Sequence, residues 1–485
     1  MNQDIRNLEP KALWNNFSNL NAVPRASKKE ERVIAFMVAF GKKLGLETIV
    51  DPIQNVIIKK PATLGMENRK TIVMQSHLDM VHQKNSDTNF DFDNEGIKML
   101  IEDGWVTADG TTLGADNGLG VAAIMSVLES SDIPHPAIEA LFTIDEETGM
   151  TGAMGLQAGY LDGEILLNLD TEEDDEIDIG CAGGVDVTAK KSYEEINLDG
   201  NCKAFKISVI GLRGGHSGMD IHRGFGNANK IMNRVFEATQ NMINIANIKG
   251  GSLRNAIPRE SFATVVCDTG DAANFIAKAE EIANQIKNDF TDIEPNLEFV
   301  IEATVCPLKA MTKDEQIKLI SATKNAHNGV FKMSKAMEGL VEASNNIAKI
   351  NVNNGTIQID CLTRSSVEES KAEVTNQLTV AFENEGFEVK LSGSYPGWKP
   401  NANSPILEVM AKLYEDIFDK KPDVVACHAG LECGILGTNY PEMDMISFGP
   451  TIKGAHSPDE RANIKSAQKF WKYLLEILKN IPAKA

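Results

Sequence analysis

Hydrophobic and polar residues follow one pattern at both ends of the chain and another in the middle. In residues 1–186, short apolar runs alternate with segments in which apolar residues recur at helical spacing. Such runs predict strands buried on both faces, within an α/β sheet covered by helices. We expect strands at 48–50, 55–59, 71–75, 140–144 and 165–169. We also expect a helix from Asp116 to Leu128, and a capping box at Ser27 to Glu30 that opens an earlier helix.

The pattern changes near Val187 and changes back near Asn403. Between these points, apolar and polar residues alternate as in half-exposed strands, and amphipathic helices separate them. We expect strands at 206–210, 262–266, 298–304 and 356–359, and helices at 227–242, 272–288 and 367–383. After the change back, strands are expected at 424–426 and 445–448, and a helix at 464–478. The sequence therefore predicts a discontinuous α/β domain, 1–186 and 397–485, interrupted by an inserted α+β domain, 187–396.

Composition argues against several classes of partner and location. The chain has 485 residues, 42% of them apolar, and a formal net charge of −21. This acidic balance argues against nucleic acid or an anionic membrane surface as a partner. No apolar run approaches the roughly 18 residues that span a bilayer, and Met1 to Arg6 lack the layout of a secretory signal. The seven cysteines have no CxxC spacing, so we expect a cytoplasmic protein with reduced cysteines.

Metal-binding residue types occur at the ends of predicted strands or at the start of a helix. Taken singly, each has an ordinary explanation, such as a helix cap, a turn or a solvated surface. Together they predict a metal site, because ligands gather beyond the carboxyl ends of the strands in open α/β sheets. A divalent ion would neutralise adjacent acids and leave one of them to act as a base. The residues are His77 and Asp79, Asp116, the run Asp145-Glu146-Glu147, and Asp170.

A further histidine, His456, follows a strand-like segment far along the chain. A metal ion needs all its ligands within roughly 2.0–2.2 Å. If His456 joins the others, the intervening chain must leave the sheet and return to it. The inserted domain predicted from the change in pattern would do this.

Four motifs make the chain resemble a known family over nearly its whole length. They are His77-Leu78-Asp79-Met80-Val81, the run from Thr112 to Gly118, Cys181-Ala182-Gly183-Gly184, and the run from His428 to Gly434. The family is that of the co-catalytic di-zinc peptidases, which includes carnosinases, aminoacylases, desuccinylases and tripeptidases. The motifs are most similar to its aminoacyl-histidine dipeptidase branch. The resemblance implies a zinc-peptidase catalytic domain with a mixed, helix-covered sheet, and an inserted α+β lid domain.

The resemblance also implies roles for single residues. His77 and Asp170 would hold one metal ion, Glu147 and His456 the other, and Asp116 would bridge both. Glu146 would be the general base and Asp79 the partner of His77. The ions would be zinc, with manganese or cobalt also accepted. Two ions can share a water and lower its pKa, and relatives often have a cis peptide bond after the bridging aspartate.

By the same resemblance, four residues outside the metal site would act on the substrate. His216 would help to bind the tetrahedral intermediate, and Asn255 and Arg364 would contact the substrate carboxylate. Glu432 would belong to the substrate pocket. From the residues alone, Arg364 could equally form a surface salt bridge, and His216 could be a histidine in a glycine-rich turn. A homodimer through the inserted domain also stays open.

The leading interpretation is a metal-dependent dipeptidase that cleaves short unblocked dipeptides and favours Xaa-His substrates of the carnosine type. One alternative is an N-acyl amino acid deacylase or a tripeptidase on the same scaffold. Another is a catalytically silent metal-binding protein. The silent alternative would normally lack a ligand or the base, and this chain has them all.

Overall fold

The computed structural model describes residues 2–198, 200–335 and 337–484, and the chain forms two compact units. Unit 1 runs up to Gly180 and continues with Trp398–Ala426 and the chain from Leu431 onward. Unit 2 comprises Cys181–Gly397 and the short segment Cys427–Gly430. It begins before Val187 because the long strand β9 (Gly183–Ser192) belongs to its sheet.

Unit 1 is built on a mixed eight-stranded sheet. Its order is β1 (Glu47–Val50), β2 (Val56–Lys60), β6 (Ile138–Thr143), β3 (Ile72–His77), β7 (Ile165–Asn168), β23 (Asp444–Ser447), β8 (Glu176–Cys181) and β22 (Asp423–Cys427). The central strands β6, β3, β7 and β23 are parallel, whereas β1 and β2 are antiparallel to their neighbours. All residues of β3, β6 and β7 are buried, as the continuous apolar runs predict. The register aligns the carboxyl ends of these three strands at one edge.

Helices cover this sheet. The almost wholly buried α4 (Ala115–Glu129) packs on β3, and α2 (Lys11–Leu20) packs on α4. Helix α3 (Glu31–Lys43) covers β1 and β2, and α11 (Pro405–Phe418) lies against both β23 and α13 (Ile464–Lys479). The shorter helices are α1 (Gln3–Arg6), α5 (Glu146–Gly149), α6 (Thr151–Gly155) and α12 (Glu432–Asn439). The predicted capping box is wrong: Glu30 caps α3 without a side-chain bond, and the Ser27 hydroxyl donates to Asp79 instead.

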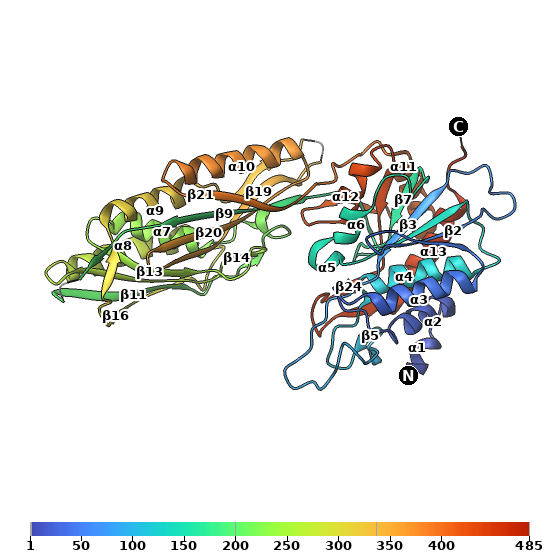
Figure 1. The fold of residues 1–485 in the computed structure, drawn as a ribbon, viewed down its shortest axis with the longest axis horizontal. Coiled ribbons are helices and arrows are strands. Elements are labelled where there is room, and N and C mark those ends of the chain that lie inside the picture. The colour runs from blue at the N-terminus through green and yellow to red at the C-terminus, as the bar shows by residue number, and fades with distance from the viewer. Residues whose placement is uncertain (1, 199, 336, 485) are drawn as a thin grey trace. The chain divides into compact units, whose positions relative to one another are not determined.

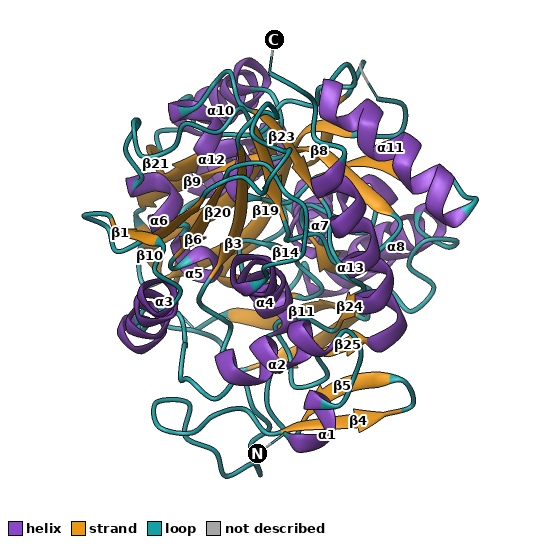
Figure 2. Cartoon of the chain, turned by 90° about the vertical axis from the view of Figure 1, so that its right-hand side faces the viewer, coloured by secondary structure: helices purple, strands orange, loops and turns teal. Residues whose placement is uncertain are grey.

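A smaller sheet of unit 1 joins segments from both parts of its chain (Figure 2). Its order is β24 (Ile452–Lys453), β25 (Arg461–Asn463), β5 (Trp105–Ala108) and β4 (Met99–Glu102). The connection from β24 to β25 carries His456. The sheet therefore ties the late histidine to the N-terminal half of the unit.

Unit 2 is a long antiparallel sheet with helices on one side. Its order is β16 (Glu298–Thr304), β11 (Cys202–Ile210), β15 (Ser261–Asp268), β13 (Asn244–Gly250), β19 (Val341–Asn353), β20 (Thr356–Ser365), β9 and β21 (Glu388–Tyr395), with β18 (Gly329–Met333) beside β19. Figure 1 shows α7 (Ala228–Thr239), α8 (Ala272–Asp289), α9 (Lys313–Asn325) and α10 (Glu368–Glu383) along the same face. Side chains from the sheet and these helices form one apolar core. Two small ribbons pair β10 (Glu195–Asn197) with β17 (Lys309–Met311), and β12 (Gly215–His216) with β14 (Ala256–Ile257).

Among the described helices, none combines the length and the apolar character that crossing a membrane requires.

Candidate active site

The strand ends of unit 1 bring the predicted metal ligands together. His77 is the last residue of β3, and Asp170 follows β7 by two residues. Glu146 and Glu147 follow β6, which pairs with β3 up to Thr143. Because parallel strands end at the same sheet edge, residues far apart in sequence meet there.

Two groups of three ligand atoms share Asp116. One contains His77, Asp116 and Asp170, and the other contains Asp116, Glu147 and His456; within each group the atoms lie within 4.8 Å of one another. His77 Nε2 is 3.2 Å from Asp116 Oδ1 and 3.6 Å from Asp170 Oδ1. His456 Nε2 is 3.2 Å from Asp116 Oδ2 and 3.0 Å from Glu147 Oε2. Each Asp116 oxygen therefore faces a different group.

The backbone around Asp116 has an unusual path. Gly114, just before α4, has a φ of +70°, a conformation that favours glycine. A Cβ at Gly114 would also lie 2.5 Å from Nη2 of Arg25. The peptide bond between Asp116 and Asn117 is cis, which confirms the prediction.

Asp79 organises the neighbouring ligands. Its backbone oxygen is 3.2 Å, and its Oδ1 is 3.4 Å, from His77 Nδ1, which leaves Nε2 directed at the ligand groups. The same carboxylate accepts hydrogen bonds from the backbone N–H groups of Glu146, at 3.0 Å, and Glu147, at 3.3 Å. Asp79 is fully buried and thus fixes both a histidine and the start of the acidic run.

The acidic run is a helical turn rather than an extended segment. Asp145 has a φ of +54°, and Glu146 begins the one-turn helix α5. Glu146 and Glu147 are therefore successive residues of one helical turn. Asp145 is instead held by Lys28, whose Nζ is 2.7 Å from Oδ2, and by Thr151 at 2.6 Å.

Burial and mutual repulsion dominate the electrostatics of this cluster. Burial raises the pKa of Glu146 well above its usual value; His77 offsets part of that rise, and Glu147 and Glu432 add to it. Burial likewise raises the pKa of Asp170. Hydrogen bonds to Asp116 and then Glu147 raise the pKa of His456 to about 11. The cluster thus favours bound positive charge, whether protons or metal ions.

The donor set fits divalent metal ions. Three carboxylates and two imidazoles are ligands that zinc accepts. The buried Asp170 Oδ1 has no hydrogen-bond partner among the described residues, so this oxygen is available to a metal ion. A second acidic group, Glu30, Asp79 and Asp145, already has protein partners, including Lys28 and Ser27.

Sequence reasoning missed two buried residues that hold the Asp116 loop. Arg25, 2% exposed, donates to the backbone oxygens of Leu78 at 3.1 Å and Asp79 at 3.0 Å, and also to that of Gly114. Glu460 accepts hydrogen bonds from the backbone N–H groups of residues 113–116, at 2.7–3.2 Å. Hydrogen bonds therefore hold the loop through both its carbonyl and its amide groups. The nearby motif residue His456 is the one sequence signal that points toward Glu460.

Glu432 lies inside unit 1, completely buried. Its Oε2 accepts hydrogen bonds from Gln75 Nε2 and Thr143 Oγ1, each at 2.6 Å. Burial raises its pKa to about 7. The carboxylate thus links the ends of β3 and β6, and it is close enough to the acidic cluster to raise the pKa of Glu146.

The remaining predicted residues, His216, Asn255 and Arg364, lie in unit 2. The backbone N–H of Ser217 donates to the Asn255 oxygen at 2.8 Å, which joins the His216 and Asn255 turns. His216 Nδ1 accepts hydrogen bonds from the backbone N–H groups of Gly218, at 3.2 Å, and Met219, at 3.0 Å. In neutral His216 the proton is therefore on Nε2, 3.5 Å from Arg364 Nη2. Two N–H donors therefore lie next to each other at this point, an arrangement suited to negatively charged groups of a ligand.

Tyr395 and His428 complete this unit 2 cluster and were not assigned roles from the sequence. Arg364, 6% exposed, donates to Tyr395 Oη at 3.2 Å. His428 Nε2 lies 2.8 Å from Ser344 Oγ, and burial, followed by Arg364 and His216, lowers the pKa of His428 to about 3. A Cβ at Gly218 would lie 2.1 Å from the His428 backbone oxygen, so only glycine fits this turn. His428 is thus a neutral neighbour of the arginine.

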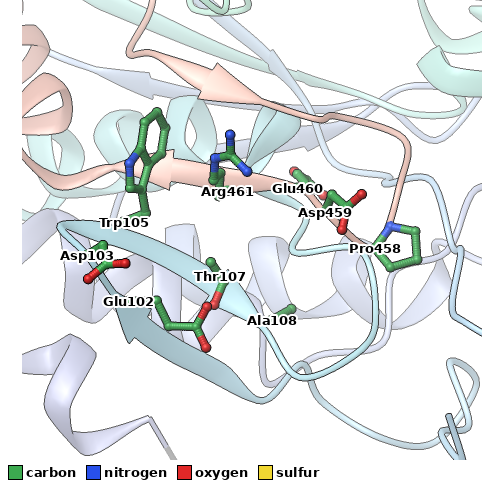
Figure 3. A pocket seen from close by; sticks show the side chains of 9 residues that line it. All are labelled: Glu102, Asp103, Trp105, Thr107, Ala108, Pro458, Asp459, Glu460 and Arg461. Carbon is green, nitrogen blue, oxygen red and sulfur yellow. The ribbon is translucent and has the colours of Figure 1, made fainter.

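A cavity of about 380 Å³ lies beside the Glu460 segment (Figure 3). It is lined by β4 and β5 residues and by residues 458–461. The Arg461 guanidinium stacks 5.2 Å above the Trp105 ring at its wall. No predicted ligand or base lines it, so we assign it no part in the chemistry.

Comparisons with known proteins agree with this architecture. Residues 73–480 match the family described as Peptidase family M20/M25/M40. The cytosol non-specific dipeptidase of Escherichia coli (strain K12) is 41% identical over 490 residues, which cover 99% of this chain and 100% of that protein. The crystal structure of aminoacylhistidine dipeptidase from Vibrio alginolyticus is 42% identical, with a TM-score of 0.91 and 99% of each chain covered. A tripeptidase from Staphylococcus aureus subsp. aureus mu50, 18% identical with a TM-score of 0.57 over 98% of this chain and 99% of that one, shares the fold.

These matches confirm the resemblance to the co-catalytic peptidases, the predicted fold class and the prediction of a metal-dependent peptidase of the dipeptidase type.

Proposed function

The chain belongs to peptidase family M20/M25/M40, and we propose that it hydrolyses short unblocked dipeptides, with Xaa-His substrates favoured, by using Glu146 as general base. The observation that carries this proposal is the pair of ligand groups sharing Asp116, with Glu146 beside them. Glu146 Oε2 is 4.0 Å from His77 Nε2.

Two divalent ions would be held by the chain's own ligands. His77, Asp116 and Asp170 would bind one, and Asp116, Glu147 and His456 the other. When bound, such ions polarise a peptide carbonyl and lower the pKa of water. The donors suit zinc, and manganese or cobalt would also be accepted.

Glu146 would move the proton. Its carboxylate has a buried, acid-rich environment that raises its affinity for a proton, as a general base near neutral pH needs. It would take a proton from water and pass it to the amine that leaves. The Asp79 carboxylate accepts a hydrogen bond from the Glu146 backbone N–H, and it would thereby hold the base in place beside the ligands.

The converging donors of unit 2 would bind the anionic parts of the substrate. We assign Arg364 and Asn255 to the terminal carboxylate, and His216 Nε2–H to the developing oxyanion. Arginine suits a carboxylate because its planar fork can donate to both oxygens. For Glu432 we propose a supporting role through Gln75 and Thr143 in place of direct contact.

A preference for a C-terminal histidine is part of the proposal because a relative of 42% identity has the name aminoacylhistidine dipeptidase. The E. coli relative is called a cytosol non-specific dipeptidase. We accordingly propose a cytoplasmic enzyme that also accepts other dipeptides, and a homodimer through unit 2 remains part of the proposal.

One assay tests the proposal. The chelated protein is reloaded with zinc, manganese or cobalt and given β-alanyl-histidine, alanyl-alanine, N-acetyl-histidine or a tripeptide. We expect metal-dependent cleavage of both dipeptides, with the histidine substrate faster. Preferred cleavage of N-acetyl-histidine or of the tripeptide would favour the deacylase or tripeptidase alternative. Loaded protein that cleaves none of the four would favour the silent metal-binding alternative.

A further inference from the structure

Cys202 and Cys306 meet at the edge of the unit 2 sheet. Cys202 is the first residue of β11, and Cys306 lies two residues beyond the end of β16. The antiparallel register pairs Ala204 with Thr304, and its continuation places Cys202 directly opposite Cys306. Their Sγ atoms are 3.0 Å apart, although the residues are separated by 104 positions in the chain.

This geometry suits a disulfide bond. The sulfur atoms are only about 1 Å further apart than in an S–S bond. Directly opposite residues on antiparallel strands have Cα atoms roughly 4.5–5.5 Å apart, which lies within the range of roughly 4.4–6.8 Å seen in disulfides. Both side chains are half-buried, so a small oxidant can reach them.

We propose that Cys202 and Cys306 are a modification site at which a peroxide forms a reversible disulfide. One thiolate attacks a peroxide oxygen, which breaks the O–O bond and gives a sulfenic acid with loss of hydroxide. The second thiol attacks that sulfur, forms the S–S bond and releases water. Overall, two thiols and one hydrogen peroxide give one disulfide and two waters. A dithiol reverses the reaction by exchange.

Two other cysteines of unit 2 are less suited to this chemistry. Cys267, 5% exposed, sits on the adjacent strand β15, and burial raises the pKa of its thiol. Cys361 is fully buried, and burial raises the pKa of its thiol to about 12. Because the thiolate is the reactive form, both should react slowly. Cys267 therefore offers a matched control close to the pair.

The bond would fasten a sheet edge. β16 is the last strand of the unit 2 sheet and pairs with β11 alone. A link at this edge would close a loop that contains two of the four helices on the sheet, α7 and α8, and would restrict the unfolded chain. Oxidation should therefore raise the melting temperature.

The test uses the whole purified protein treated with hydrogen peroxide or dithiothreitol, alkylated, digested and analysed by mass spectrometry. We expect a linked Cys202–Cys306 peptide pair that dithiothreitol removes, and a faster band of the denatured chain on a non-reducing gel. Cys306→Ser and Cys202→Ser should each lose both signals and the rise in melting temperature, and Cys267→Ser should keep all three.

The proposal is overturned if peroxide leaves both thiols open to alkylation while other cysteines oxidise. It is also overturned if Cys306 links to Cys267, or if Cys306→Ser keeps the faster band. The wild-type peptide map decides the matter even if a serine variant folds poorly.

Discussion

Unit 1 and unit 2 gather opposite kinds of polar group. Unit 1 collects carboxylates beyond the ends of parallel strands, where register alone brings His77 beside Asp170. Unit 2 collects N–H donors on antiparallel strands, where Arg364 and His216 converge from β20 and β12. An excess of acid calls for bound cations, and converging donors call for an anion. This difference fits the proposed division of roles, in which unit 1 would supply the metal chemistry and unit 2 the recognition of substrate charge.

Glu146→Gln should have the largest effect of the variants considered, and it tests the chemical role of unit 1. Loss of the general base should lower kcat by about 10³-fold. Bound metal per chain should not change, because Glu146 is not among the five ligands proposed above. Steady-state kinetics and metal analysis check this, with the exposed Glu47→Gln as control. Near-normal hydrolysis would refute the assignment of the base.

In unit 2, Arg364→Met should act on binding instead. A lost hydrogen bond to a charged group is worth about 1.5–3 kcal/mol, so KM for a dipeptide should rise roughly 10- to 100-fold. Arg364→Lys should recover only part of the lost substrate affinity, since lysine lacks the planar guanidinium group. Metal content should stay the same in both. A fall in metal content, or a change in kcat alone, would contradict the division of roles.

His428, in unit 2, should make the stability of the folded chain depend on pH. Its pKa is about 3 in the folded chain and about 6.5 when unfolded, so the unfolded state binds more protons below pH 6.5. Stability is therefore lost as pH falls from 6.5 toward 3, by about 2 kcal/mol between pH 7 and 5. Urea unfolding of metal-free wild type and His428→Gln should show this difference in slope. The exposed His82→Asn in unit 1 should keep the wild-type slope; an unchanged slope in His428→Gln would refute the prediction.

The smallest effect should come from Glu460→Gln in unit 1. The carboxylate accepts four backbone hydrogen bonds, and an amide has one oxygen to offer them. Misplacing the Asp116 loop should weaken metal affinity about 10-fold, as for other partners of metal ligands. Metal titration measures it, with Asp459→Asn as the exposed neighbour control. Equal affinities in both variants would show that the loop needs no such support.

Much of unit 1 could be predicted because its strands are short and fully buried. Continuous apolar runs identified β3, β6 and β7, and the residues after them proved to meet. The strands β9 and β19 of unit 2 were not identified; in β19, the polar residues Asn345 and Asn346 are buried. Their hydrogen bonds to distant backbone are not visible in a local pattern.

The supporting residues were beyond sequence reasoning for a related cause. Arg25 grips oxygens 53 and 89 residues away, and Glu460 binds amides more than 340 residues away. In a sequence, an arginine that the fold will bury cannot be distinguished from one on the surface. His428 was seen as part of a motif, but its place beside Arg364 comes from the pairing of Ser344 with Arg364 across β19 and β20.

The segment Cys427–Gly430 has a consequence for how this architecture can be recombined. It belongs to unit 2, where the Ala182 N–H donates to the oxygens of Cys427 and Ala429, while the chain on either side belongs to unit 1. A genetic exchange of residues 181–397 between relatives would leave this tetrapeptide behind, with His428 still of the old type. A complete unit 2 is therefore encoded by two separate segments. A chimaera needs a second pair of crossovers to receive both segments from the same relative.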